Sequence, residues 1–138
     1  MRVSQRLDYA LRAIVLLAQQ PQGVLVAAGD LAERLSLPRR FVEQQVSAMA
    51  GAGLVTCRRG ASGGCALARP ASAISVLEVV EAIQGDVLDV PRASGSAASE
   101  LWADAAGELS AFLGTVSVAQ LAERQRELDH AVVPMYWI

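Results

Sequence analysis

Lysine is absent from this chain of 138 residues, and all 12 basic side chains are arginines. We attribute this bias, together with the abundance of alanine, to a GC-rich coding background. The formal net charge is -2. This balance argues against a histone-like or broadly adhesive basic protein. It does not exclude a sequence-specific DNA-binding protein, because such a protein needs positive charge only locally.

Histidine is also scarce, and His130 is the one example. No Ser/His/Asp or Cys/His arrangement is suggested around it. The chain has no GxxxxGK[ST] phosphate-binding loop. Its two cysteines, Cys57 and Cys65, are too few for a zinc site, and no further ligand lies near them in the sequence. We therefore expect no catalytic residues, no metal ligands and no cofactor, and we do not expect an enzyme.

Long hydrophobic runs are missing as well. The longest, residues 13–18, is far too short to cross a bilayer, and no signal peptide is visible. We therefore expect a cytoplasmic protein with no membrane partner. In that compartment two cysteines do not suggest a disulfide framework.

Positive charge is present, but it is concentrated in one part of the chain. Acidic residues predominate over residues 78–108. The local basic set consists of Arg34, Arg39, Arg40, Arg58, Arg59 and Arg69. This distribution is what a DNA-binding protein of low net charge requires.

Helical periodicity predicts a first helix over residues 4–20 and a short second helix over residues 30–35. Ser36 and Leu37 form a tight turn, and Pro38 is suited to the first turn of the next helix. A short helix, a tight turn and a longer helix form a helix-turn-helix.

The third helix, from residue 38 to residue 49, divides into two faces. Its apolar face should dock on the rest of the domain, and its polar face offers amide and guanidinium groups that reach base edges and phosphates. The apolar set is Val42, Val46 and Met49, with Phe41 beside them. The polar set is Arg40, Gln44 and Ser47, flanked by Arg39 and Glu43. An ordinary amphipathic surface helix is the alternative.

A basic hairpin, which we call the wing, follows over residues 54–69. Strands are expected at 54–59 and 65–69, joined by the glycine-rich turn 60–64. The turn carries few side chains, so it could approach a sugar-phosphate backbone closely. Arg58 and Arg59 stand where one of them could enter a narrow minor groove. Alternatively, they are solvated charges that protect an edge strand from aggregation.

The C-terminal part should be helical. A Ser75–Glu78 capping box opens a helix that ends at Gly85. Residues 86–98 have the composition of a loop, and a long helix starts at Ser99. Its apolar stripe comprises Leu101, Trp102, Ala105, Leu109 and Phe112. We expect this stripe to join two copies of the chain, with packing on the first helix as the alternative.

These patterns predict a mainly α protein with a small β-hairpin wing, namely a winged helix-turn-helix followed by a long C-terminal dimerisation helix. Its regions are a DNA-binding domain at 1–85, a loop at 86–98, and a dimerisation helix, following helix and tail at 99–138. Cys57 and Cys65 flank the wing turn, and they would be close if the strands pair in register. They are either small apolar strand residues or a thiol-based redox switch in the wing.

Several segments together resemble a known family. They are 8–13 (DYALRA), 31–34 (LAER), 38–44 (PRRFVEQ), 52–55 (AGLV), 59–64 (RGASGG), 67–70 (LARP) and 74–85 (ISVLEVVEAIQG). The sequence resembles the bacterial Rrf-two family of winged-helix transcription regulators, the family of IscR, NsrR and CymR. The resemblance implies a homodimer that binds an imperfect palindrome in double-stranded DNA and usually represses transcription.

The resemblance also assigns residues. The positions matching the family's DNA contacts are Arg39, Arg40, Glu43 and Gln44 in the third helix, and Arg59, Gly60 and Ser62 in the wing. Arg59 would enter the minor groove.

One departure from the family pattern bears on the cofactor. Iron–sulfur members carry three closely spaced cysteines in the loop before the long helix, and the loop 86–98 has none. Asp8 matches a carboxylate ligand of some members, and without the thiolates we expect it to cap or pair locally. We therefore expect no iron–sulfur cluster. The signal is then a small ligand, thiol oxidation or a protein co-regulator. A winged-helix module that reads a protein instead of DNA is a further alternative.

Overall fold

The computed structural model describes residues 3–91 and 93–132. The tail 133–138, which we grouped with the dimerisation region, lies outside the described residues. The elements are α1 (Gln5–Ala18), α2 (Ala28–Leu35), α3 (Arg39–Gly51), β1 (Val55–Arg58), β2 (Gly64–Leu67), the 3-10 turn η1 (Ala71–Ala73), α4 (Val76–Gln84), α5 (Ala97–Thr115) and α6 (Val118–Val132). The protein is mainly α-helical with one antiparallel hairpin, as the sequence predicts.

The helix-turn-helix is built from local signals that the sequence contains. Ser4 caps α1 by accepting a hydrogen bond from the backbone N–H of Leu7 at 3.1 Å. Ser36 adopts a left-handed conformation with φ of 55°, which ends α2 and turns the chain into α3. The second helix begins at Ala28, two residues before its expected start at Asp30.

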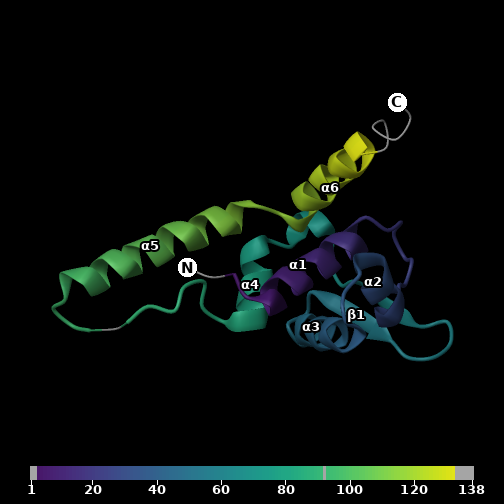
Figure 1. Cartoon of the computed structure of the whole chain (residues 1–138), viewed down its shortest axis with the longest axis horizontal. Coiled ribbons are helices and arrows are strands. Elements are labelled where there is room, and N and C mark those ends of the chain that lie inside the picture. Colours follow the sequence, from purple (N-terminus) through teal and green to yellow (C-terminus); the bar gives the residue numbers. More distant parts are fainter. Residues whose placement is uncertain (1–2, 92, 133–138) are drawn as a thin grey trace.

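The core surrounds α1, which lies between α3, α4 and α6 (Figure 1). Helix α1 contributes Ala10 and Ile14, which are fully buried. The expected inward residues of the recognition helix α3, Val42, Val46 and Met49, are buried against them. This packing fixes the orientation of α3 and leaves its other face free.

The wing is fastened to the helical core by a backbone contact. Val26 forms an isolated bridge with Cys65, in which each backbone N–H donates to the other residue's carbonyl at 2.9 and 2.8 Å. Residue 26 directly precedes Ala27, the N-cap of α2. The position of the wing is therefore coupled to the start of the helix-turn-helix.

Helix α5 projects from the core instead of covering it (Figure 1). It begins at Ala97, capped by Ser96, and not at Ser99 as the sequence suggested. None of its residues is buried. It packs mainly against α4, while α6 takes the place on α1 that we considered for the long helix. No helix among the described residues is long and apolar enough to cross a membrane.

Candidate nucleic-acid interface

One face of α3 is exposed and polar along its whole length. Arg39, Arg40, Glu43, Gln44 and Ser47 all lie on the surface. Arg39 and Glu43 form an ion pair at 2.7 Å, one helical turn apart. The pair joins two exposed side chains and leaves Arg40 and Gln44 beside it on the same exposed face.

Two residues of α3 differ from the expected division of faces. Phe41 was expected beside the apolar face, yet it is 46% exposed. Its ring and that of Tyr9 are arranged edge to face, with 6.2 Å between ring centroids. Gln45, which the sequence did not single out, is buried. On the helical wheel Gln45 lies beside Met49, at the edge of the apolar face, and this position is the signal that could have indicated its burial.

The wing has the expected layout with shorter strands than predicted. Val55 pairs with Leu67, and Arg58 with Gly64. At the tip, the N–H of Gly63 donates to the carbonyl of Gly60 at 3.0 Å. A Cβ on Gly63 would lie 2.1 Å from the carbonyl oxygen of Arg58, so only glycine fits this turn.

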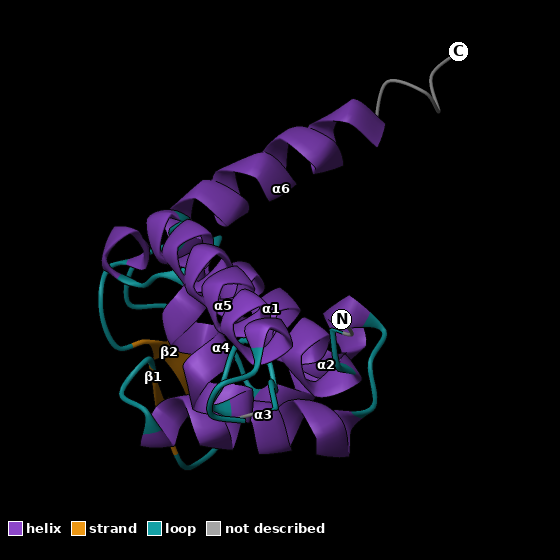
Figure 2. Ribbon diagram, turned by 90° about the vertical axis from the view of Figure 1, so that its left-hand side faces the viewer, coloured by secondary structure: helices purple, strands orange, loops and turns teal. Residues whose placement is uncertain are grey.

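The basic and small residues of the wing tip face solvent. Arg58, Arg59, Gly60 and Ser62 are exposed. Within residues 3–91 and 93–132, Arg40, Arg58 and Arg59 form no ion pair. In both views the wing and α3 lie at the end of the molecule opposite α6 (Figures 1 and 2). The exposed donors of the two elements are therefore available to one ligand.

Arg69 has a structural role instead. Its guanidinium pairs with Glu78 and donates to the carbonyl of Ala73 at 3.1 Å. The Arg69 hydrogen bond and, less strongly, the backbone N–H of Ser75 hold the pKa of Glu78 below its usual value, although partial burial opposes them. Arg69 thus joins the end of the wing to the start of α4.

The two cysteines are directly opposed in the wing. Cys57 pairs in register with Cys65, and their sulfur atoms lie 2.7 Å apart. Cys57 is exposed, and Cys65 is buried in the core. Burial, and then the neighbouring Cys57, raise the pKa of the Cys65 thiol to about 12. The condition stated from sequence, that the strands pair in register, is met.

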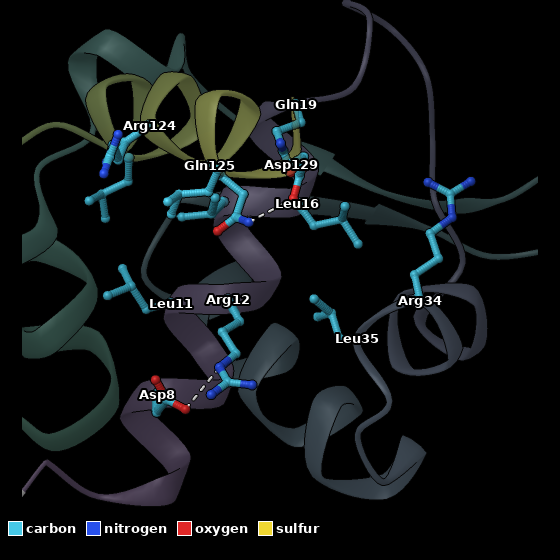
Figure 3. Close-up of a pocket in the computed structure, with 13 residues that line it drawn as sticks. Asp8, Leu11, Arg12, Leu16, Gln19, Arg34, Leu35, Arg124, Gln125 and Asp129 are labelled. Carbon is cyan, nitrogen blue, oxygen red and sulfur yellow. Dashed lines mark hydrogen bonds and ion pairs between the residues drawn. The ribbon is translucent and has the colours of Figure 1, made fainter. Parts of the chain in front are cut away.

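The residues around Asp8 do not fit an iron–sulfur cluster. Asp8 forms an ion pair with Arg12 at 3.0 Å (Figure 3), which confirms the expectation of local pairing. Such clusters are held chiefly by cysteine thiolates. Both cysteines lie in the wing, and in the part of the chain that the structure describes no three His, Cys, Asp or Glu side chains could jointly hold a metal ion.

Two cavities border Asp8. One, of about 640 Å³, lies between α1, α2 and α6, and Arg34, Arg124 and Asp129 stand around it (Figure 3). The other, of about 840 Å³, lies where the segment after α4 meets α1 and α5, and it is largely aliphatic. Residues such as Leu7, Val80 and Leu109 line this second cavity.

The expected dimerisation stripe is exposed in the single chain. Leu101 is 60% exposed, Trp102 47% and Phe112 62%. Ala105 is also exposed, and Leu109 is partly buried at the second cavity. Several large apolar side chains on one projecting helix form an unpartnered surface.

A helix-turn-helix with an exposed polar third helix, followed by a glycine-tipped basic hairpin, defines a winged helix-turn-helix protein of the DNA-binding class. Residues 3–124 match the Rrf2 family, described as iron-dependent transcriptional regulators. The chain belongs to this family and is a DNA-binding transcription regulator.

Relatives and solved structures agree with this membership. The HTH-type transcriptional regulator IscR of Xenorhabdus nematophila is 32% identical over 140 residues, which cover 95% of this chain and 85% of that protein. The structure of CymR, the global cysteine regulator of B. subtilis, has a TM-score of 0.80 and 25% identity, covering 90% of this chain and 98% of that one. The T. potens IscR structure has a TM-score of 0.78 and 26% identity, covering 93% and 90%.

Proposed function

We propose that this protein is a homodimeric repressor that binds an imperfect palindrome without an iron–sulfur cluster. The observation that carries the proposal is the shared exposure of α3 and the wing tip at one end of the molecule. In a complex, Arg40 and Gln44 reach base edges in the major groove, and Arg59 enters the adjacent minor groove.

The other contacts have supporting roles. Arg39 and Glu43, held together at 2.7 Å, present a guanidinium to a phosphate and a carboxylate to a cytosine amino group. Arg58 contacts the sugar-phosphate backbone of the DNA beside the wing. Gly60 and Ser62 allow the tip to approach the sugar-phosphate chain, with the Ser62 hydroxyl as a donor.

The palindrome follows from symmetry. Two copies joined through the α5 stripe by a twofold axis present two identical α3 helices, so their DNA site has two inverted half-sites. A repressor of this kind acts by occupying a promoter. The signal that releases it is independent of a cluster, since the residues bordering Asp8 supply no thiolates.

The test is a binding titration with a salt series. Purified metal-free protein is titrated into a labelled duplex from upstream of its own gene, and into a scrambled duplex of equal length and composition. We expect tight binding to the first duplex only. Each phosphate neutralised should add roughly 0.9 to the log–log salt slope.

Weak and similar binding to both duplexes would contradict the proposal. A shallow salt dependence in that case would favour the module that reads a protein partner. If binding is specific, transcription from the same upstream fragment in vitro, with and without protein, decides whether the regulator represses. Chelator-treated and untreated protein should bind equally, and a requirement for added iron would contradict the cluster-free assignment.

A further inference from the structure

The wing contains a thiol pair with backbone geometry suited to bond formation. Both backbone polar groups of Cys65 are used by Val26, which lies on the side of β2 away from β1. The carbonyl of Leu54 accepts the N–H of Ala68 at 3.0 Å, so Leu54 and Ala68 form a hydrogen-bonded pair three positions along the ladder, an odd number. Cys57 and Cys65 therefore occupy a non-hydrogen-bonded position of the antiparallel pair.

At such a position opposed Cα atoms lie about 4.5 Å apart, closer than at a hydrogen-bonded position. Disulfides usually span Cα separations of about 4.4 to 6.8 Å. The register therefore places the two residues within the range that a disulfide can bridge, and their sulfur atoms are already in contact. No rearrangement of the strands is needed before the bond forms.

The two thiols differ in ways that assign the order of events. Cys57 is exposed and open to a dissolved oxidant. Cys65 is buried, and its raised pKa keeps it protonated at neutral pH. Cys57 is therefore the residue that reacts first, and Cys65 is the resolving residue.

We propose that Cys57 and Cys65 form a reversible disulfide across the wing, and that this modification weakens the grip of the wing on DNA. The proposal rests on the DNA-binding function above. The Cys57 thiolate attacks one oxygen of hydrogen peroxide and breaks the O–O bond, which gives a sulfenic acid on Cys57 and a hydroxide that is protonated to water. The Cys65 sulfur then attacks the Cys57 sulfur, forming the S–S bond, and the sulfenic hydroxyl leaves with the Cys65 proton as water.

The reaction balances as two thiols and one hydrogen peroxide giving one disulfide and two waters. The reverse reaction uses a dithiol reductant, which attacks the exposed Cys57 sulfur and leaves as its own disulfide. Both directions are open because one sulfur of the pair faces solvent.

The position of the bond connects it to binding. Arg58 and Arg59 directly follow Cys57, and Gly64 is held against the backbone of Val26 and Ala27. One strand of the wing is therefore anchored to α2, and the other carries the arginines. A crosslink between them restricts how far the Arg59 strand can adjust to a minor groove. We expect oxidation to weaken operator binding by roughly tenfold or more.

The test treats reduced protein with hydrogen peroxide and reads out the bond and the binding separately. Trypsin cuts between the cysteines, because Arg58 and Arg59 separate them, and it does not cut Arg69, which precedes Pro70. Before digestion, the oxidised protein should have the mass of a single chain. Its tryptic digest should contain peptide 41–58 linked to peptide 60–92, and a dithiol should separate the two peptides. Binding to the upstream duplex should weaken and recover with reduction.

Two variants and one control complete the design. The first variant is Cys57→Ser, and the second is the apolar replacement Cys65→Ala. In each variant the linked peptides should be absent, and peroxide should not change DNA binding. The double variant Cys57→Ser with Thr56→Cys keeps two thiols but moves one to the opposite face of β1, where it pairs with Ala66. It should also be insensitive.

Each result is decisive. Absence of the linked peptides, or an unchanged or tighter affinity of the oxidised protein, overturns the proposal. If peroxide still weakens binding by the double variant, the effect comes from other thiol chemistry, and the proposal is overturned. If the reduced wild-type protein binds no duplex, the proposed function fails on its own, and the linked peptides still decide whether the wing disulfide forms.

Discussion

Arg59 is the residue whose removal tests the orientation of the wing most directly. It follows β1, is exposed, and precedes the turn that only glycine can complete at residue 63. We expect Arg59→Ala to weaken binding to the upstream duplex by roughly tenfold and to reduce the salt slope by about 2, one unit for each subunit of the proposed dimer. Titrations at several salt concentrations measure both quantities.

The matched control for this change is Arg126→Ala, which removes an arginine from α6 at the other end of the molecule. It should leave both the affinity and the salt slope unchanged. Equal effects of the two variants would mean that the wing does not contact DNA and that the arginines act only through net charge.

Glu78 makes a second residue-scale prediction, on stability. Its folded-state pKa is lowered, mainly by Arg69. Its contribution to stability is therefore present above the usual carboxyl pKa and is lost as the pH falls through the lowered value. Glu78→Gln keeps an acceptor for the capping box and removes the charge. Because both partners are partly exposed, we expect a loss of up to about 1 kcal/mol at neutral pH.

Urea denaturation at several pH values measures this loss. The difference between wild type and Glu78→Gln should shrink as the pH is lowered into the acid range, because the wild-type carboxylate is then protonated too. Glu81→Gln, an exposed position on the same helix, is the control and should change stability little. A difference that grows toward acid pH would contradict the assigned pKa shift.

At the scale of elements, predictability followed the strength of the local signals. The Ser75–Glu78 capping box was predicted from the sequence and it forms, and Ser117 and Gln120 make a second one at the start of α6. The start of α5 was missed by two residues because Ser96 and Ser99 are both capable caps, and sequence alone does not rank them. Phe41 was placed beside the apolar face, whereas its aromatic contact is with Tyr9 of α1. The helical period of α3 alone does not reveal a contact with another helix.

The anchoring of the wing lay beyond sequence analysis for a different reason. A single bridging residue such as Val26 has no periodicity to detect, and its partner Cys65 lies 39 positions away in the numbering. The faces of α3 were predictable because burial follows the helical period there. The assignment of particular DNA contacts to Arg40, Gln44 and Arg59 stays a prediction.

Gly63 provides the prediction for the wing as an element. A Cβ there would meet the Arg58 carbonyl oxygen at 2.1 Å, and backbone atoms cannot yield as a flexible side chain would. We expect Gly63→Ala to open the turn, displace Arg58 and Arg59, and weaken DNA binding roughly tenfold or more. Hydrogen exchange of the wing amides and the binding titration measure the two effects.

Gly51→Ala is the control for this change. Residue 51 is the last of α3, and a Cβ there meets no atom within 4 Å. Since alanine favours a helix over glycine by up to about 1 kcal/mol, the control should be neutral or slightly more stable and should bind DNA normally. Normal binding by Gly63→Ala would show that the tip conformation does not matter for recognition.

On the scale of the whole molecule, the arrangement separates the DNA-facing end from the α5 surface. Helices α1 to α4 and the wing share one core, whereas α5 projects from it without a buried residue. The exposed apolar side chains of α5 are removed from water only if a partner covers them. The proposed second copy of the chain would provide one, and a twofold axis through α5 would place two α3 helices on one DNA.

The double variant Leu101→Asp with Phe112→Asp tests this arrangement. Both side chains are more than half exposed in the single chain, so the fold should survive and circular dichroism should be unchanged. Each apolar side chain buried at a twofold interface contributes on the order of 2 kcal/mol to the free energy of dimerisation. Each residue occurs once in each subunit, so its contribution is made twice. We therefore expect light scattering to show a dimer for wild type and a monomer for the variant.

Gly107→Asp adds a charge to the same helix at a position where a Cβ meets nothing within 4 Å, and it should remain dimeric. The monomeric variant should bind a single half-site as weakly as it binds the full palindrome, because it lacks the second recognition helix. A variant that stays dimeric while folded would place the interface elsewhere on the molecule. A monomeric variant with full affinity for the palindrome would instead show that one chain suffices for recognition.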